Sequence, residues 1–489
     1  MLFNSQAFLI FASLFFLFWP WFRQTNALRW GYLIVASFIF YGWWDYRYLL
    51  LLIAIGMIDF FAALGMVARP RQRHLLLSLS IASNLGILFS FKYLLFAAEN
   101  LTLAASWFGF DGSLVDQVPK FMWTVPVGIS FYTFQSMSYT IDVFTGQLKP
   151  TRNILHYFAY LSLFPQLMAG PIVRASDLLP QLLTARKSTR EDQWEGLRLI
   201  AHGFFKKVVV ADTLATLVSA AFAQQTTQGS GLYWWVISLA FTIQIYCDFS
   251  GYSDIARGLG KWMGYEIMVN FNHPYTATSM QDFWNRWHIS LTSWFRDYIY
   301  YPLVRRNLEQ IRSGAAWVGQ WRMLVILWIT MLASGLWHGA AWHFVLWGAA
   351  HALFLSIEIL TRWPLHLKKW PGGRWLAWML TMLQVVAAMF IFRAESMDQI
   401  GVILTKMFLF QDGLKLGIGS IITMRDLLVL SILIGIMIMR ELYFFIQGEQ
   451  LLKKFGMHSW VRGPFVVAAI LILSIYLRAP KAEFIYFQF

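Results

Sequence analysis

Apolar stretches separated by short polar or basic segments extend along nearly all of the 489 residues. A helix needs about 20 predominantly apolar residues to cross a bilayer. Runs of roughly this kind occur near residues 7–22, 28–44, 48–68, 74–98, 121–143, 197–223, 232–247, 322–337, 342–361, 375–392, 424–446 and 463–477. Several are short or interrupted, so the pattern predicts an all-α polytopic membrane protein with about eleven transmembrane helices. No repeat, linker or soluble domain separates the runs, so we expect residues 1–489 to form a single integral-membrane domain.

One apolar segment, Phe164–Arg174, is broken by Pro165, Gly170 and Pro171. Non-helical backbone at membrane depth is tolerated only where protein or a water-filled cavity satisfies its polar groups. The pattern therefore favours a re-entrant or broken helix that lines a cavity. An ordinary surface turn is the alternative. The segment that follows, Asp177–Lys207, is charged and helical in pattern, and we expect it along the cytoplasmic face.

The stretch Ser279–Tyr300 combines aromatic and polar residues with helical spacing. At about 100° per residue, one face gathers Met280, Phe283, Trp287, Leu291, Trp294 and Tyr298. A neighbouring polar stripe gathers Asn285, His288, Thr292 and Arg296. The stretch is too polar to face lipid on all sides, and its tryptophans and arginines suit a membrane boundary. We therefore expect one helix over this stretch, lying at the interface.

Composition and charge agree with a membrane protein. Hydrophobic residues make up 58% of the chain and charged residues only 13%, which excludes an ordinary soluble domain. The net charge of +14 is scattered between apolar runs. Because cytoplasmic loops are enriched in Lys and Arg, we place residues 69–73 and 305–322 in the cytoplasm and expect no nucleic-acid binding. Residues 99–118, which carry few bases, are expected to be periplasmic. With the basic segment after residue 361 also cytoplasmic, residues 322–361 form a hairpin.

A second histidine, His338, lies near the turn of this hairpin. Gly335 and Gly339 beside it allow another backbone to approach closely. An imidazole among apolar membrane residues is expensive, and by default it marks a functional site that needs a partner. The alternative is a hydrogen-bonded packing histidine beside a close helix contact. His343 and His351 follow in the same hairpin, and for both of them packing is the better interpretation.

Metal and disulfide chemistry find little support in the sequence. Cys247 is the sole cysteine, which excludes an internal disulfide and a cysteine-based zinc site. No HExxH motif occurs, and His338 and His343 are five positions apart, off the i, i+4 spacing of a helical metal pair. We expect neither a metal site nor a tightly bound cofactor. Asp248 and Asp254 do not share a helix face, so we expect them to cap helices and pair with nearby donors.

Several motifs together carry a resemblance to a known family. The two histidines lie in Trp-Asn-Arg-Trp-His288-Ile-Ser-Leu and in Ser-Gly-Leu-Trp-His338-Gly-Ala. Four other stretches agree with them: Val125–Tyr132, Phe164–Pro171, Asp248–Asp254 and Phe484–Phe489. The chain resembles the membrane-bound O-acyltransferase (MBOAT) family, and within it the branch that contains the alginate O-acetyltransferase membrane subunit. The resemblance spans nearly the whole chain.

The resemblance implies a helical bundle with re-entrant and interfacial helices around a central cavity, and an active site at His288 and His338. O-acyl transfer needs a base for the attacking hydroxyl, and a neutral imidazole suits that task. We assign this role to His338. His288 is then expected to orient the substrate or to polarise the thioester carbonyl. Substrate contacts are expected from four residues close to the two histidines in sequence: Asn285, Thr292, Arg296 and Trp337.

By the same resemblance, the donor would be acetyl-CoA or another acetyl thioester at the cytoplasmic face. The protein would cross the bacterial inner membrane several times, in contact with membrane lipid. A periplasmic acetyltransferase would serve as partner, and an exported polysaccharide or cell-wall glycan would be the final acceptor. Two alternatives stay open at this point: D-alanyl or lipid acyl transfer on the same scaffold, and a non-enzymatic transporter. Transporters usually contain internal repeats with matched broken helices, and this sequence has one broken segment and no repeat.

Overall fold

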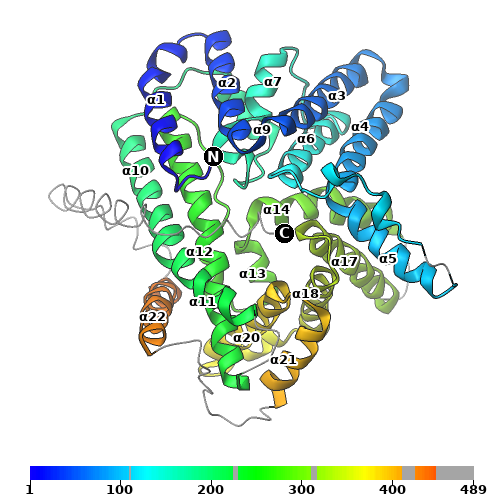
Figure 1. Cartoon of the computed structure of the whole chain (residues 1–489), viewed down its shortest axis with the longest axis vertical. Coiled ribbons are helices and arrows are strands. Elements are labelled where there is room, and N and C mark those ends of the chain that lie inside the picture. The colour runs from blue at the N-terminus through cyan, green and yellow to red at the C-terminus, as the bar shows by residue number, and fades with distance from the viewer. Residues whose placement is uncertain (110–111, 224–228, 310–315, 410–423, 448–489) are drawn as a thin grey trace. The chain divides into compact units, whose positions relative to one another are not determined.

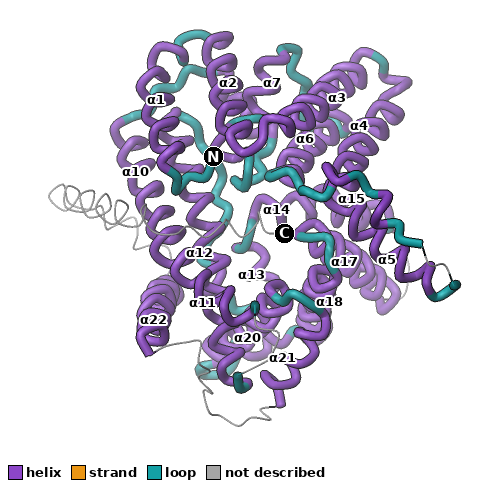
Figure 2. Tube along the Cα trace, viewed as in Figure 1, coloured by secondary structure: helices purple, strands orange, loops and turns teal. Residues whose placement is uncertain are grey.

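The computed structural model describes residues 1–109, 112–223, 229–309, 316–409 and 424–447. Helices joined by loops make up these ranges, and no β-strand occurs within them (Figures 1 and 2). The prediction of an all-α protein is therefore confirmed. The contacts divide the chain into two compact units. We call them the N-terminal unit (Met1–His202 with Tyr252–Val269) and the C-terminal unit (Gly203–Gly251 with Asn270–Phe489), and we describe each by itself.

The principal helices of the N-terminal unit follow one another in chain order. They are α1 (Gln6–Phe22), α2 (Asn26–Asp45), α3 (Leu49–Ala68), α4 (Arg73–Leu88), α5 (Leu94–Ser106), α6 (Ile129–Phe144), α7 (Ile154–Leu161), α8 (Phe164–Leu167), α9 (Ala175–Leu183) and α10 (Arg190–Phe204). The helix α12 (Gly231–Met263) contributes residues to both units.

The C-terminal unit contains both candidate histidines. Its remaining helices are η6 (Phe205–Ala211), α11 (Asp212–Phe222), η7 (Pro274–Thr276), α13 (Met280–Arg286), α14 (Ile289–Phe295), η8 (Arg296–Tyr300), α15 (Tyr301–Arg306), α17 (Ala316–His338), α18 (Trp342–Thr361), α19 (Trp363–Leu367), α20 (Gly373–Arg393), α21 (Met397–Leu409) and α22 (Met424–Gln447).

Six helical segments within the described residues are long and apolar enough to cross a membrane. They are Asn26–Ala68, Pro70–Ser106, Gly231–Met263, Trp317–His338, Trp342–Thr361 and Gly373–Arg393. The chain is thus a multi-pass membrane protein, and the larger number of about eleven spans remains a prediction. The apolar run at 463–477 lies outside the described residues. The apolar run at 121–143 predicted a helix that begins near residue 121. The helix α6 instead begins at Ile129, after the left-handed Gly128 (φ 77°).

The segment at Phe164–Arg174 is broken and buried in protein, and the cavity that it was expected to line remains a prediction. The segment consists of the short helix α8 followed by non-helical backbone, and nearly all of it is buried. Two of its polar groups bind partners within the N-terminal unit. The Phe164 N–H donates to Ser37 Oγ (3.0 Å), and the Gln166 Nε2 donates to the Tyr160 carbonyl oxygen (2.9 Å). Because buried protein atoms satisfy this backbone, the alternative of a surface turn is wrong.

A carboxylate that the sequence analysis did not single out, Asp59, lies fully buried in the N-terminal unit. Ser80 Oγ donates to it at 2.6 Å, Asn84 Nδ2 donates at 2.9 Å, and Ser136 Oγ donates as well. These donors come from α4 and α6, so the carboxylate connects three helices through hydrogen bonds. Buried polar groups of membrane helices are tolerated when they are satisfied in this way.

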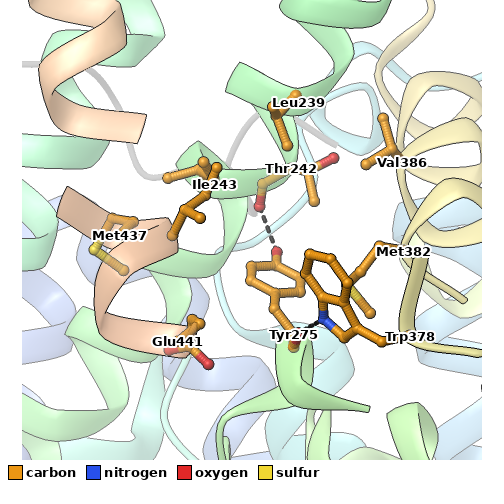
Figure 3. A pocket seen from close by; sticks show the side chains of 10 residues that line it. Leu239, Thr242, Ile243, Tyr275, Trp378, Met382, Val386, Met437 and Glu441 are labelled. Atoms are coloured by element: carbon orange, nitrogen blue, oxygen red, sulfur yellow. Dashed lines mark hydrogen bonds between the residues drawn. The ribbon is translucent and has the colours of Figure 1, made fainter. Parts of the chain in front are cut away.

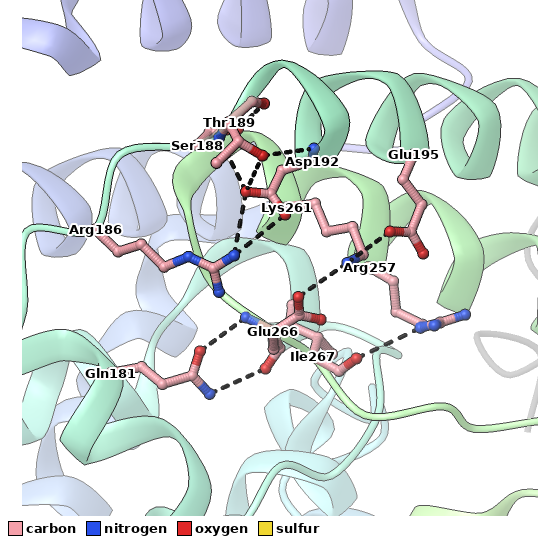
Figure 4. A network of polar contacts seen from close by, with 10 residues as sticks. All are labelled: Gln181, Arg186, Ser188, Thr189, Asp192, Glu195, Arg257, Lys261, Glu266 and Ile267. Carbon is pink, nitrogen blue, oxygen red and sulfur yellow. Dashed lines mark hydrogen bonds and ion pairs between the residues drawn. The ribbon is translucent and has the colours of Figure 1, made fainter.

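A polar network connects α9 and α10 with the C-terminal part of α12 (Figure 4). The side-chain amide of Gln181 binds the backbone of Glu266 twice, accepting from its N–H (2.8 Å) and donating to its carbonyl oxygen (3.1 Å). The Lys261 ammonium lies 2.9 Å from Glu266 and 3.0 Å from Glu195. These contacts hold the end of α12 and the segment after it against α9 and α10.

The predicted charged segment Asp177–Lys207 is helical except at residues 184–189, between α9 and α10, and its last two lysines are not on a solvated face. Lys206 and Lys207 are 4% and 8% exposed. The Lys207 ammonium lies 2.7 Å from Asp248 and 2.9 Å from Asp212, and both carboxylates are nearly buried. The burial of Lys206 and Lys207 was not expected from their pattern, and Asp212 and Asp248 compensate the buried charge of Lys207. The cytoplasmic location of the segment remains a prediction.

The hairpin predicted for residues 322–361 is confirmed, since α17 and α18 pack side by side around a three-residue turn after His338. A Cβ added at Gly335 would lie 2.3 Å from the Phe344 carbonyl oxygen, so this glycine does permit close backbone approach. A Cβ at Gly339 would instead meet the Phe344 ring at 2.0 Å. The prediction of close backbone contact thus holds at Gly335, whereas Gly339 makes room for a side chain.

We expect Gly335→Ala to destabilise the protein by about 1–3 kcal/mol, because the added methyl overpacks against backbone that cannot turn aside. The unfolding midpoint of purified protein in detergent measures this effect. Gly31→Ala in α2 is the matched control, since no atom lies within 4 Å of its added Cβ. That control should unfold at the same temperature or slightly higher. Equal midpoints for both variants would contradict the close contact between α17 and α18.

Candidate active site

The backbone changes direction at Trp287 and His288. The helix α13 ends at Arg286, Trp287 is extended (φ −98°, ψ 128°), and α14 begins at Ile289. His288 itself is left-handed, with φ 42° and ψ 52°. The prediction of one continuous helix over Ser279–Tyr300 is therefore wrong. A positive φ is uncommon for a residue other than glycine, and such strain clusters at functional sites.

The segment that begins at Asn270 stabilises this break through its hydrogen bonds. The Ile289 N–H donates to the Asn270 carbonyl oxygen (2.8 Å), and the Ser290 N–H donates to Asn270 Oδ1 (3.1 Å). On the other side of the break, the Asn272 N–H donates to the Arg286 carbonyl oxygen (2.9 Å). The backbone groups released by the interrupted helix thus find partners. Asn270 was not among the residues singled out from the sequence.

The same asparagine determines the tautomer of His288. Because Asn270 Oδ1 accepts from a backbone N–H, this atom is the amide oxygen. His288 Nδ1 lies 3.3 Å from it and 3.5 Å from Ser290 Oγ. Since the amide oxygen can only accept, Nδ1 carries the proton and Nε2 carries the lone pair. Burial lowers the pKa of His288 to about 3, so the imidazole is neutral at ordinary pH.

The second histidine, His338, is the last residue of α17 and is 4% exposed. Its ring packs edge-on against three aromatic rings, with centroid distances of 5.0 Å to Trp337, 4.9 Å to Trp347 and 5.3 Å to Phe392. The carbonyl groups at a helix C-terminus carry partial negative charge and stabilise a nearby cation. His338 therefore lies at the negative end of the α17 helix dipole, among aromatic rings.

Trp337 connects the two histidines. Its ring centroid lies 6.0 Å from that of His288 and 5.0 Å from that of His338. The indole is 3% exposed. The structure thus brings together the two histidines that lie 50 positions apart in the sequence, and it places the predicted contact residue Trp337 between them.

The other predicted contact residues do not gather at this site. Asn285 is exposed on α13. Thr292 Oγ1 donates to the Trp287 carbonyl oxygen (3.0 Å), which supports the helix break. Arg296 is exposed and pairs with the neighbouring Asp297 (2.9 Å). The predicted polar stripe depends on one straight helix, and the break at Trp287 and His288 disperses it. Substrate binding by these three residues remains a prediction.

The helix α18 fixes the start of α13 through the side chain of Glu358. The carboxylate of Glu358 accepts a hydrogen bond from the Met280 N–H (2.6 Å) at the N-terminus of α13. This arrangement satisfies a backbone donor that the first helical turn leaves open, and it places negative charge at the positive end of the helix. The start of α13 is thereby fixed two turns before His288.

His351 of α18 packs against Trp347, one of the aromatic residues that contact His338. It is fully buried, and its ring lies 4.6 Å from that of Trp347 and 4.9 Å from that of Trp284. Neither ring nitrogen has a hydrogen-bond partner among the described residues. These contacts agree with the packing role expected from the sequence. Over the described ranges, no group of three or more His, Cys, Asp or Glu residues is arranged to hold a metal ion.

Comparison with known proteins identifies the family. Residues 144–397, slightly more than half of the chain, match the profile of the membrane-bound O-acyltransferase family. The chain is 38% identical to the probable alginate O-acetylase of Pseudomonas putida, over 84% of this chain and 81% of that protein. This chain belongs to the membrane-bound O-acyltransferase family. The matched residues include both His288 and His338.

Two further proteins are also similar to this chain. The peptidoglycan O-acetyltransferase of Helicobacter pylori is 31% identical over 75% of the chain and 71% of its own length. The teichoic acid D-alanyltransferase of Bacillus subtilis is 26% identical over 55% of the chain and 69% of its own length. This protein is thus an O-acyltransferase, and the two buried histidines form its candidate active site.

We expect Asn270→Ala to lower the kcat/KM of acyl transfer about tenfold to a hundredfold, because it removes the acceptor that fixes the His288 tautomer. Asn270→Asp keeps the acceptor oxygen and should retain normal protein levels. Its added carboxylate should raise the pKa of His288, which would shift the pH profile of activity. Gln281→Ala, an exposed polar change on α13, serves as the control. Full activity of Asn270→Ala at every pH would refute the role given to Asn270.

Proposed function

We propose that this O-acyltransferase takes an acetyl group from a thioester at the cytoplasmic face of the bacterial inner membrane. The acetyl group crosses the membrane for O-acetylation of an exported polysaccharide or cell-wall glycan of the alginate kind. The observation that carries this proposal is the pair of buried imidazoles on either side of Trp337. The names of the alginate and peptidoglycan relatives support the acetyl group and the glycan acceptor.

In the proposed reaction a hydroxyl oxygen attacks the thioester carbonyl while His338 takes up the hydroxyl proton. The new C–O bond forms, the C–S bond breaks, and the departing thiolate recovers the proton from the imidazolium. A positioned base of this kind contributes about 10²- to 10⁴-fold to the rate. His338 suits the role because the C-terminus of α17 stabilises its charged form while the surrounding rings exclude water.

His288 is assigned the orientation of the substrate through a hydrogen-bond donor other than the reacting hydroxyl, whose single proton goes to His338. Because its Nδ1 proton is directed at Asn270, its Nε2 atom can accept a hydrogen bond and cannot donate one. This tautomer favours substrate orientation over polarisation of the thioester carbonyl, which would require a donor. Its pKa of about 3 also makes it the poorer base at neutral pH, since catalytic bases work best near the operating pH.

The donor in this proposal is acetyl-CoA or a carrier-bound acetyl thioester, and no tightly bound cofactor is required. Both kinds of donor carry phosphate groups. The exposed arginines Arg296, Arg305 and Arg306 on η8 and α15 would attract such an anionic partner. A periplasmic acetyltransferase would complete the transfer to the polymer. We also propose that residues 1–489 form a single membrane domain.

D-alanyl transfer is the second candidate within the family. The teichoic acid D-alanyltransferase match is weaker and covers only 55% of the chain, compared with 84% for the alginate relative. We therefore favour acetyl transfer.

Replacing His338 by Ala is expected to lower acetyl transfer by about 10²- to 10⁴-fold while the protein still inserts at normal levels, because the base is lost. Acetyl transfer from a radiolabelled thioester and abundance in the membrane are measured on the same preparation. His338→Gln keeps the size of the side chain and one hydrogen-bonding group, so it separates a packing role from a basic one. Near-normal transfer by well-inserted His338→Gln would overturn the assignment. His343→Gln, at a half-buried position, is the matched control.

Replacing Arg305 and Arg306 together by Gln is expected to raise the KM for the thioester about tenfold at low salt, with kcat nearly unchanged, because two charges that attract the donor are lost. The wild-type KM should rise with ionic strength more steeply than that of the variant. If both proteins show the same KM and the same salt dependence, these arginines do not meet the donor.

A further inference from the structure

A pocket of about 220 Å³ opens in the C-terminal unit between α12, α20 and α22 (Figure 3). On α12 it is lined by Leu239 and Ile243, which are one helical turn apart, and on α20 by Met382 and Val386, which have the same spacing. Met437 of α22 faces them. Each helix therefore presents a single apolar face, and these faces enclose the pocket.

The aromatic residues of the pocket direct their polar atoms into the protein. Tyr275 Oη donates to the Thr242 carbonyl oxygen (2.5 Å), and Trp378 Nε1 donates to the Tyr275 carbonyl oxygen (2.7 Å). The lining that remains is almost entirely carbon. Glu441 has the one carboxylate among the described residues that line the pocket, and it lies 3.4 Å from His273 Nδ1. The pocket is thus suited to a hydrocarbon and poorly suited to a sugar or a phosphate.

The surroundings of the pocket point to the source of the hydrocarbon. The helices α12 and α20 are both candidate membrane spans. Beside the pocket, Met379 and Leu383 of α20 and Ile436 and Met439 of α22 are exposed apolar side chains. Within a membrane, this surface faces acyl chains. Empty apolar cavities of about 150 Å³ already take up benzene-sized molecules, so this larger pocket can hold a segment of a chain. An acetyl group would leave most of it empty.

We propose that this pocket binds one acyl chain of a membrane phospholipid. The pocket lies close to the active site through Tyr275, whose ring lies 5.0 Å from that of Tyr246 and 6.2 Å from that of Trp287. Trp287 directly precedes His288. A bound chain therefore packs against Tyr275 and, through it, supports Tyr246 and Trp287 next to the helix break at His288. This inference concerns lipid binding alone, and it stands whether or not the transferred group is acetyl.

The test uses the full-length protein in nanodiscs of phosphatidylethanolamine that contain a small fraction of a phospholipid with a photoreactive diazirine on one acyl chain. After irradiation, mass spectrometry should locate the crosslinks on the pocket faces of α12, α20 and α22. Met382→Trp fills the pocket. It is expected to reduce both these crosslinks and the phospholipid that co-purifies in mild detergent by about tenfold, because a bulky residue overpacks the site.

Met379→Trp is the matched control, since it makes the same change one turn away on the exposed face of α20. It should keep the wild-type crosslinks and the retained lipid. If Met382→Trp elutes as aggregate in gel filtration, Val386→Phe is used in its place to fill the pocket. Three results would overturn the proposal. They are crosslinks spread evenly over the exposed apolar surface, equal lipid retention in the filled and control variants, and a retained molecule that lacks a fatty acyl chain, such as a polyprenyl lipid.

Discussion

The candidate site depends on the hydrogen bonds that Asn270 makes to the interrupted helix. In a membrane protein, backbone groups released by a helix break must find partners inside the protein. Here the backbone and side chain of one asparagine receive the N–H groups of Ile289 and Ser290, so the chain can turn sharply at His288. The same side-chain oxygen fixes the imidazole tautomer. Backbone geometry and side-chain chemistry at His288 therefore have one common cause.

The position of His338 follows from a different constraint, which is the close packing of α17 and α18. Small residues allow this approach, because a Cβ at Gly335 or Gly348 would meet backbone carbonyl oxygens at 2.3 and 2.5 Å. The tight hairpin leaves His338 as the final helical residue, with Trp337 beside it. His288 is thus placed by hydrogen bonds and His338 by helix packing. Both imidazoles contact the indole ring of Trp337.

Long apolar runs predicted most of the helices, because a bilayer allows few other structures. The hairpin and the buried broken segment at Phe164–Arg174 were predicted for the same reason. The break at His288 was not, since helical periodicity carries no information about a left-handed residue held by distant groups. The burial of Lys207 was also missed. Its partners Asp212 and Asp248 have no recognisable pairing in the sequence, and only folding brings them within 2.7–2.9 Å of the ammonium.

The two histidines share an indole and yet have different environments, and this difference suits the roles that we propose for them in acyl transfer. A base must become charged and then neutral again, so it benefits from the helix C-terminus beside His338. A positioning residue must keep one protonation state throughout, and full burial together with the bond to Asn270 provides this for His288. In the mechanism that we propose, these environments suit His338 to bind the hydroxyl proton and His288 to maintain the geometry of the substrate.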